Sequence, residues 1–283
     1  MSERKGVRLA ALVGLALVAF AGNSLLARLA LREGGMDAAS FTGLRLASGA
    51  AVLWALAAWQ SRIEAGRGSW ASALALFVYA AAFSLAYVEL QAGAGALLLF
   101  GAVQLSMLAW GLLRGERFSA WQIVGLLLAL SGLLILLLPG SSAPALDGAL
   151  LMLLSGVAWG IYSLRGRGAS NPLVATAGNF IKAVPLAAVL CLVTLGQQQW
   201  DAPGIVYALL SGALTSGVGY AIWYAALPGL AAIQAASVQL SVPLLTAIAG
   251  TVLLGEALTA TLIISGAAIL GGIAMVLSIR HRG

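Results

Sequence analysis

The sequence predicts an all-α polytopic membrane protein with ten transmembrane helices, built as two inverted five-helix repeats with both termini cytoplasmic. Composition, the spacing of apolar segments and an internal similarity support this fold. Hydrophobic residues occupy 61% of the 283 positions and charged residues only 8%, whereas a soluble domain carries about 25% charged residues. Most of the surface must therefore face hydrocarbon rather than water.

The ten spans follow from the length that a bilayer requires. A helix that crosses the hydrocarbon core needs about 20 apolar residues. The segments of this kind, separated by polar residues or by Pro and Gly, lie at roughly 8–31, 38–60, 69–90, 92–113, 119–138, 146–164, 172–195, 203–226, 230–254 and 259–279.

Basic residues predict the orientation of these spans. Cytoplasmic connections of membrane proteins carry an excess of Lys and Arg. Eleven of the fifteen basic residues precede the first span, follow the last or lie in connections on that same side: Arg4, Lys5, Arg8, Arg62, Arg67, Arg114, Arg117, Arg165, Arg167, Arg280 and Arg282. The opposite side has Arg28, Arg32 and most of the acids, so both termini are expected in the cytoplasm.

An internal similarity divides the chain into residues 1–140 and 141–283. Residues 112–136 are similar to residues 253–277, and Gly115-Glu116 corresponds to Gly255-Glu256, 140 positions later. Each half contains five spans, an odd number, so the second half enters the membrane from the opposite side. Two inverted repeats in one membrane domain are a design of transporters, in which the halves move about a central site.

These features resemble a known family. The resemblance lies in the two Gly-Glu segments, in Ala158-Trp159-Gly160 of the sixth span and in Arg45 of a Phe-x-x-x-Arg in the second. The sequence resembles EamA-type proteins of the drug/metabolite transporter superfamily. The stretches 19–50 and 155–168 most resemble YddG-type bacterial exporters of aromatic amino acids. The resemblance implies amino acid export across the bacterial cell inner membrane. In one departure, Pro243 has Val103 as its counterpart, so the fourth span is expected to be straighter than the ninth.

Several other classes of function are excluded by missing residues. The only histidine is His281, in the C-terminal tail, so no span has a His-based metal site or general base. A P-loop and a Ser-His arrangement are also absent. We expect no enzyme, no cofactor and no metal. Despite a pI near 10.0, the dispersed basic residues do not predict a nucleic-acid partner. The expected partners are the lipid bilayer and an amino acid substrate, and a monomer is expected.

Aromatic residues with polar atoms mark a candidate substrate site in three spans. One helical face of the eighth span carries Ser216, Gly217, Tyr220, Trp223 and Tyr224. The third span adds Tyr79, Phe83 and Tyr87, and the sixth adds Trp159 and Tyr162. An aromatic cavity favours apolar or aromatic substrates. The alternatives are packing between helices and the interfacial belt, to which Trp59, Trp70, Trp121 and Trp200 are assigned.

Uncharged polar residues complete the candidate site. Within the spans lie Gln104, Asn179 and Gln234, together with Asn23, Ser24, Ser106, Ser237, Gln239 and Ser241. Their amides and hydroxyls are suited to binding the ammonium and carboxylate of an amino acid. The alternative is that they join helices, as such groups commonly do in membranes.

Charged residues inside spans are costly and usually functional. Lys182 and Arg45 occupy nearly equivalent places in the two halves, and we assign the substrate carboxylate to Lys182, with Arg45 snorkelling or paired with backbone carbonyls. All acids lie in connections or at span ends, and Glu116 and Glu256 are expected to cap or orient the next helix. Without a deep acid the prediction is passive facilitated export. Efflux of drug-like or other metabolites and a small-solute channel remain the alternatives.

Overall fold

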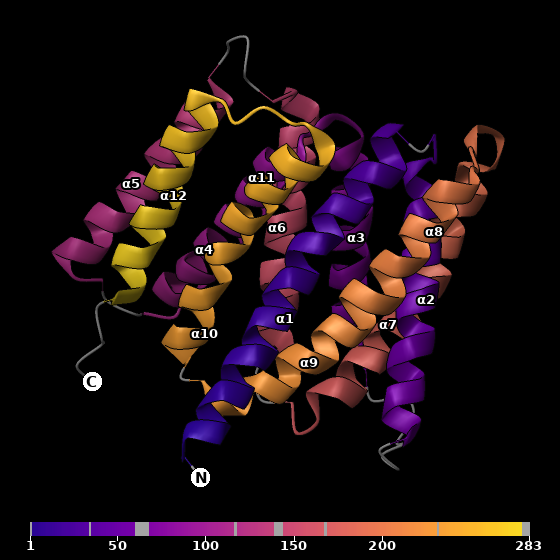
Figure 1. Ribbon diagram of the computed structural model, residues 1–283, viewed down its shortest axis with the longest axis horizontal. Coiled ribbons are helices and arrows are strands. Elements are labelled where there is room, and N and C mark those ends of the chain that lie inside the picture. Colours follow the sequence, from indigo (N-terminus) through magenta and orange to yellow (C-terminus); the bar gives the residue numbers. More distant parts are fainter. Residues whose placement is uncertain are drawn as a thin grey trace.

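The computed structural model describes residues 2–33, 35–59, 68–115, 118–138, 144–166, 169–230 and 232–278, and these residues are helical apart from short connections. Figure 1 shows a single bundle, with the start of α1 and the end of α12 at the same end. The α-helices are α1 Ser2–Arg28, α2 Ala38–Trp59, α3 Trp70–Glu89, α4 Ala92–Leu113, α5 Ala120–Leu137, α6 Leu146–Gly166, α7 Pro172–Val193, α8 Ala202–Leu210, α9 Gly219–Ala226, α10 Ala232–Gln239, α11 Ser241–Leu254 and α12 Ala260–Ser278.

Four shorter helical segments complete the elements. Two have the wider turns of a π-helix, namely η1 Leu29–Glu33 and η3 Ser211–Val218, and two are 3₁₀ turns, namely η2 Leu195–Gln197 and η4 Leu227–Gly229. The first span runs through α1 and η1, the eighth runs through α8, η3, α9 and η4, and the ninth is made of α10 and α11.

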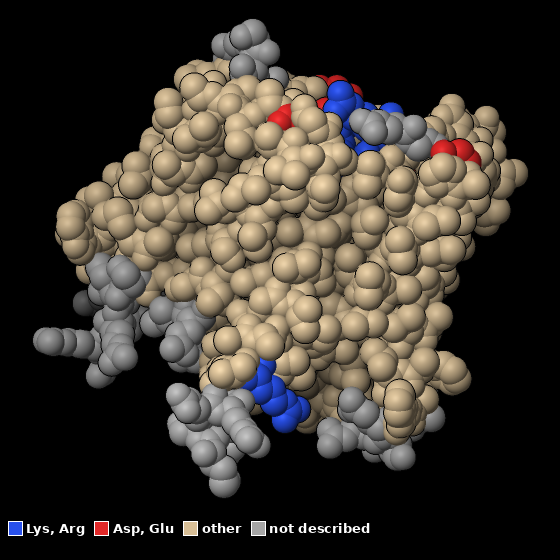
Figure 2. Space-filling model, viewed as in Figure 1, with Lys and Arg blue, Asp and Glu red and all other residues tan. Residues whose placement is uncertain are grey.

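The prediction of ten membrane-spanning helices is confirmed. Ten helical stretches of the described chain are long and apolar enough to cross a bilayer, from Gly6–Arg32 at the start to Ala260–Leu277 at the end. In Figure 2 a broad band without charged side chains separates the two ends of the visible face, with basic and acidic side chains together at the upper end and a basic side chain at the lower end. This arrangement matches a body surrounded by hydrocarbon with its charges in the interfaces.

Polar caps determine where several helices begin. The hydroxyl of Ser119 accepts from the backbone of Gln122, whose side chain bonds back to Ser119 in a capping box. Asn171 caps α7 immediately before Pro172, and Asp201 caps α8. These side chains satisfy backbone N–H groups that a helix start leaves unpaired.

Helices from the two halves of the chain pack against each other. The most extensive contacts join α5 with α12, α3 with α6 and α2 with α7, and Figure 1 shows α5 and α12 together at one edge of the bundle. Their backbones meet closely, since a Cβ at Gly125 would lie 2.6 Å from the carbonyl oxygen of Gly272. Small residues permit this approach between membrane helices.

Apart from η1 at the end of the first span, the irregular helical segments within spans lie in the eighth and ninth. The ninth span breaks at Leu240, and Pro243 lies in the first turn of α11, where its missing N–H is tolerated. The fourth span is the unbroken helix α4, so the two spans differ in continuity, and whether the fourth is also straighter stays a prediction. Wide turns in a membrane helix frequently mark a functional site, and η3 borders the cavity described next.

Candidate functional site

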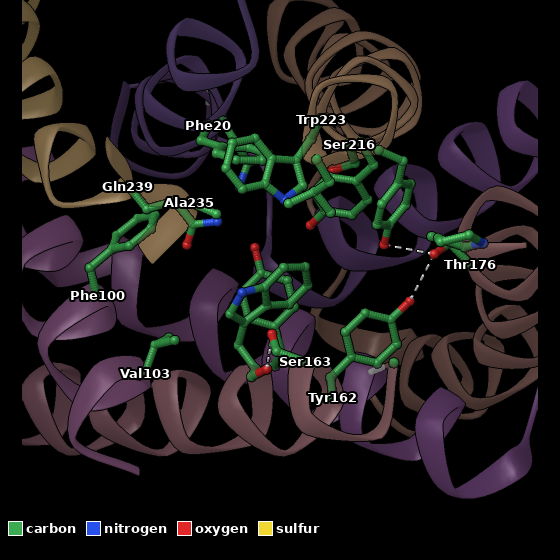
Figure 3. Close-up of a pocket in the computed structure, with 18 of the residues that line it drawn as sticks. Phe20, Phe100, Val103, Tyr162, Ser163, Thr176, Ser216, Trp223, Ala235 and Gln239 are labelled. Carbon is green, nitrogen blue, oxygen red and sulfur yellow. Dashed lines mark hydrogen bonds between the residues drawn. The ribbon is translucent and has the colours of Figure 1, made fainter. Parts of the chain in front are cut away.

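A cavity of about 450 Å³ lies between α1, α3, α4, α6, α7, η3, α9 and α10 (Figure 3). This volume falls within the range of roughly 300–1,000 Å³ that small-molecule sites occupy. Its lining extends to Gly166, Ala169 and Pro172, at the connection between α6 and α7. The cavity therefore reaches the end of the bundle where the first helix begins.

Trp159 is at the centre of an aromatic cluster in the wall of the cavity. Its ring centroid lies 4.7 Å from that of Tyr79, 5.2 Å from Tyr162 and 5.4 Å from Tyr220. Phe20 of α1 extends the cluster, with edge-on contacts to Tyr220 and Trp223. The clustering of aromatics predicted from the third, sixth and eighth spans is thus present in the structure.

Hydroxyl and amide groups form a second part of the wall. Thr176 bonds to the hydroxyl of Tyr224 over 2.8 Å and accepts from that of Tyr162 over 3.5 Å (Figure 3). Asn179 donates to the Tyr162 hydroxyl and accepts from the backbone N–H of Ser69. It therefore lines the cavity and also links α7 to the residue before α3. Gln104 and Gln239 also line the cavity.

Most of the predicted site residues meet at this cavity. Its lining includes Tyr79, Gln104, Trp159, Tyr162, Asn179, Ser216, Tyr220, Trp223 and Tyr224. By contrast the four tryptophans assigned to the interfacial belt, Trp59, Trp70, Trp121 and Trp200, are at least half exposed on the surface of the protein. The distinction between cavity and belt aromatics therefore agrees with the structure.

Other predicted residues lie away from the cavity. Phe83 and Tyr87 are fully buried and continue the ring contacts from Tyr79 toward the Arg28 end of α3 without reaching the lining. Lys182 also lies outside the lining, and its ammonium donates to the carbonyl of Gly68. Gln234 belongs to α10, but its side chain is outside the described part of the chain.

Two expectations about charged residues need correction. Arg45 does not pair with backbone carbonyls, because its guanidinium donates to the hydroxyls of Tyr79 and Ser216. Glu256 does not cap the helix that follows it, because its carboxylate accepts from the backbone N–H of Ala92, at the start of α4. Long-range packing, which repeat symmetry does not reveal, determines both partners.

The far end of the bundle is closed by a buried ion pair. Nε of Arg28 lies 3.1 Å from Oε1 of Glu256, with both side chains about 5% exposed. The Arg28 guanidinium also donates to the carbonyls of Tyr87 and Val88. One network therefore joins α1, the α3–α4 connection and the α11–α12 connection, and none of its residues contributes to the cavity lining.

Sequence reasoning missed several lining residues. Phe20 and Phe100 occupy runs of apolar residues, where nothing in the pattern distinguishes a cavity wall from a lipid-facing surface. Thr176 is a single hydroxyl in an apolar helix and gives only a weak signal. Its position in α7, four residues after Pro172, acquires meaning only when Tyr162 and Tyr224 are placed beside it.

Comparisons with known proteins agree with this architecture. Residues 146–278 match the EamA-like transporter family. Over 267 residues the chain is 61% identical to Uncharacterized protein PA1977 of Pseudomonas aeruginosa, a match that covers 94% of this chain and 93% of that protein. The second half of the chain therefore contains an EamA-like transporter family domain. A solved protein crystal structure, 19% identical, has the same fold, with a TM-score of 0.66 over 97% of this chain and 99% of that one.

The region matched to the EamA-like transporter family contains much of the cavity. It supplies Trp159, Tyr162 and the aromatic residues of α9, as well as Glu256 of the buried ion pair. Phe20, Tyr79 and Gln104 come from helices before the matched region. The cavity is therefore shared between the EamA-like region and the helices that precede it.

Proposed function

We propose that the chain is an inner-membrane exporter of aromatic and other apolar amino acids that works by alternating access. The observation that carries this proposal is the wall of the cavity, where the ring cluster around Trp159 adjoins the polar groups of Gln104, Thr176 and Asn179. Ring contacts contribute about 0.5–1.5 kcal/mol for each aromatic pair. Such a wall suits a ligand with an apolar side chain and a polar backbone.

The two ends of the bundle support alternating access. The cavity reaches the end with the α6–α7 connection, whereas the Arg28–Glu256 network ties helices together at the other end. With the termini in the cytoplasm, as the basic residues predict, this conformation is open inward. Inverted repeats, of residues 1–140 and 141–283, would supply the opposite conformation by exchanging the roles of the two halves.

Transport without ion coupling is part of the proposal. In the described part of the chain the cavity lining contains no Asp, Glu, His, Lys or Arg. Asp37 and Asp201 cap helices, and Glu256 is held by Arg28 and Ala92. Since an ion-coupled carrier needs a group that binds the ion at depth, we infer that export follows the gradient of the substrate itself.

The substrate class is tested with the purified full-length chain in proteoliposomes. Uptake of each of the twenty radiolabelled amino acids is compared with uptake into liposomes without protein. The proposal predicts greater uptake of phenylalanine, tyrosine, tryptophan and amino acids with large aliphatic side chains than of aspartate, glutamate or lysine. If the proteoliposomes take up no amino acid but do take up an aromatic amine or another drug-like metabolite, the result would support the alternative of metabolite efflux.

A further inference from the structure

Arg45 is a buried cation directly behind the cavity wall. It is only 1% exposed, within the membrane-spanning helix α2. Its Nη2 donates to the Tyr79 hydroxyl over 2.7 Å and its Nε to the Ser216 hydroxyl over 3.4 Å. Its guanidinium carbon lies 4.7 Å from the centre of the Phe83 ring. Nη1 is buried and has no hydrogen-bond partner in the described part of the chain.

Among the described residues, the charge of Arg45 has no counter-ion. The ion pairs among the described residues join Arg28 and Arg32 to Glu256, and neither involves Arg45. A cation inside a membrane protein normally faces a partner of opposite charge or water, because hydrocarbon does not solvate it. The rings of Tyr79 and Phe83 offset part of this cost through cation–π contacts. A negative charge brought by a ligand would offset much more.

Tyr79 and Ser216 connect this charge to the cavity. Both residues line it, and both hydroxyl oxygens accept a hydrogen bond from Arg45. A hydroxyl that accepts in this way keeps its own hydrogen for donation. Hydrogen bonds in a chain also polarise one another, so a hydroxyl attached to a guanidinium is a stronger donor. The two hydroxyls are therefore donors at the cavity wall that the Arg45 charge strengthens, while the guanidinium itself stays buried.

We propose that the hydroxyls of Tyr79 and Ser216, backed by the guanidinium of Arg45, bind the carboxylate of the transported substrate. This inference rests on the proposed function and specifies its substrate as a carboxylate with an apolar side chain. An ionised carboxylate accepts hydrogen bonds and donates none. It therefore matches two hydroxyls that both have a hydrogen to donate. Its side chain then lies on the rings of Trp159 and Tyr220, since the Tyr79 and Trp159 centroids are 4.7 Å apart.

The test measures binding separately from transport. Ligand-dependent thermal stabilisation of the detergent-purified full chain is titrated with L-phenylalanine, with 3-phenylpropanoate, which lacks the ammonium, and with L-phenylalaninamide, which lacks the carboxylate. Hydrogen bonds to a charged group correspond to at least about a tenfold change in affinity. We expect both carboxylates to bind at least about tenfold more tightly than the amide.

Two variants that each lose one hydroxyl locate the binding point. Tyr79 and Tyr162 both line the cavity and both contact the Trp159 ring, but only Tyr79 bonds to Arg45. Tyr79→Phe should reduce the preference for carboxylate over amide several-fold, whereas Tyr162→Phe should leave that ratio unchanged even if overall affinity moves. Ser216→Ala is expected to resemble Tyr79→Phe, and it provides an independent result if one variant fails to fold.

Each outcome separates the carboxylate site from the proposed function. Equal affinity of the wild type for the amide and the carboxylates overturns the site, and so does an unchanged ratio in both Tyr79→Phe and Ser216→Ala. Counterflow of labelled phenylalanine in proteoliposomes is measured on the same preparation. Selective carboxylate binding without counterflow would leave the site standing and remove the exporter proposal, whereas counterflow without carboxylate preference would do the reverse.

Discussion

Arg28 and Glu256, 228 residues apart in the chain, form a buried ion pair with a distance of 3.1 Å between Nε and Oε1. Glu256 also accepts from the backbone of Ala92 over 2.8 Å. The pair thus holds the first span, the start of the fourth and the connection before the tenth together at one end of the bundle. In an alternating-access cycle these contacts must break when that end opens.

We therefore predict that Glu256→Gln opens this end. The variant keeps an oxygen for Ala92 but leaves the buried Arg28 charge uncompensated, which costs about 3–5 kcal/mol. Opening is measured in a Cys191→Ala background in which Ser24→Cys places a thiol in the cavity wall. A membrane-impermeant thiol reagent applied at the Arg28 end should react with this thiol faster in the Glu256→Gln variant than in the same background with Glu256 intact. Arg32→Gln is the matched control, since Arg32 is 47% exposed and 3.9 Å from Glu256, a pair worth about 0–1 kcal/mol. Equal labelling in the two variants would refute the closing role.

Removal of a ring from the cavity should weaken aromatic substrates selectively. Tyr220 has ring contacts with Phe20, Trp159 and Phe180, and Tyr220→Ala should lower the apparent affinity for phenylalanine by about tenfold, the loss of one or two aromatic pairs. Tyr79→Ala should act in the same direction. Uptake assays at equal protein level should show little change for Trp70→Ala and Trp200→Ala, which alter exposed rings; comparable losses in all four variants would contradict the cavity assignment.

Gly212 of the wide-turn segment η3 should not tolerate a side chain. A Cβ at this position would overlap the carbonyl oxygen of Arg45 and the hydroxyl of Ser48. Gly212→Ala must force α2 and η3 apart, and overpacking of this kind costs about 1–3 kcal/mol. Thermal melting in detergent should show a lower midpoint. Gly14→Ala serves as the control, because a Cβ built there meets no described atom within 4 Å outside the neighbouring backbone of its own helix, and alanine favours a helix by about 0.5–1 kcal/mol. A midpoint lowered as much by Gly14→Ala would exclude this explanation.

Lys182→Gln should retain substrate affinity. Its ammonium donates to the Gly68 carbonyl and the residue is outside the cavity lining, so we expect the substitution to affect stability rather than recognition. Phenylalanine titrations of the variant and the wild type should agree within about twofold, well below the change that a lost charged hydrogen bond produces. A loss of tenfold or more would return the carboxylate role to Lys182.

Much of the fold was predictable because hydrocarbon imposes simple rules on sequence. Ten apolar segments predicted the ten spans, and Pro243 predicted a difference between the fourth and ninth spans. The wide turns of η3 were not predictable. They depend on Gly212 and Gly217 packing against α2, a contact between segments about 160 residues apart that no local pattern contains.

The candidate site was predicted only in part, for a related reason. Periodicity placed Tyr79, Phe83 and Tyr87 on one face, but a face extends past the end of a cavity, and only Tyr79 reaches the lining. The sequence placed Arg45 and Lys182 at nearly equivalent positions of the two halves and favoured Lys182 for the substrate carboxylate. The structure separates them, because Arg45 lies beside Tyr79 and Ser216 whereas Lys182 lies beside Gly68.

Counterflow tests the central claim of an alternating-access amino acid carrier most directly. Proteoliposomes are loaded with unlabelled phenylalanine and diluted into a trace of labelled phenylalanine. A carrier predicts a transient accumulation of label that decays to equilibrium, and that is unaffected by an imposed pH step or sodium gradient. Simple equilibration without this overshoot would indicate a channel, and sustained accumulation driven by either gradient would contradict passive export.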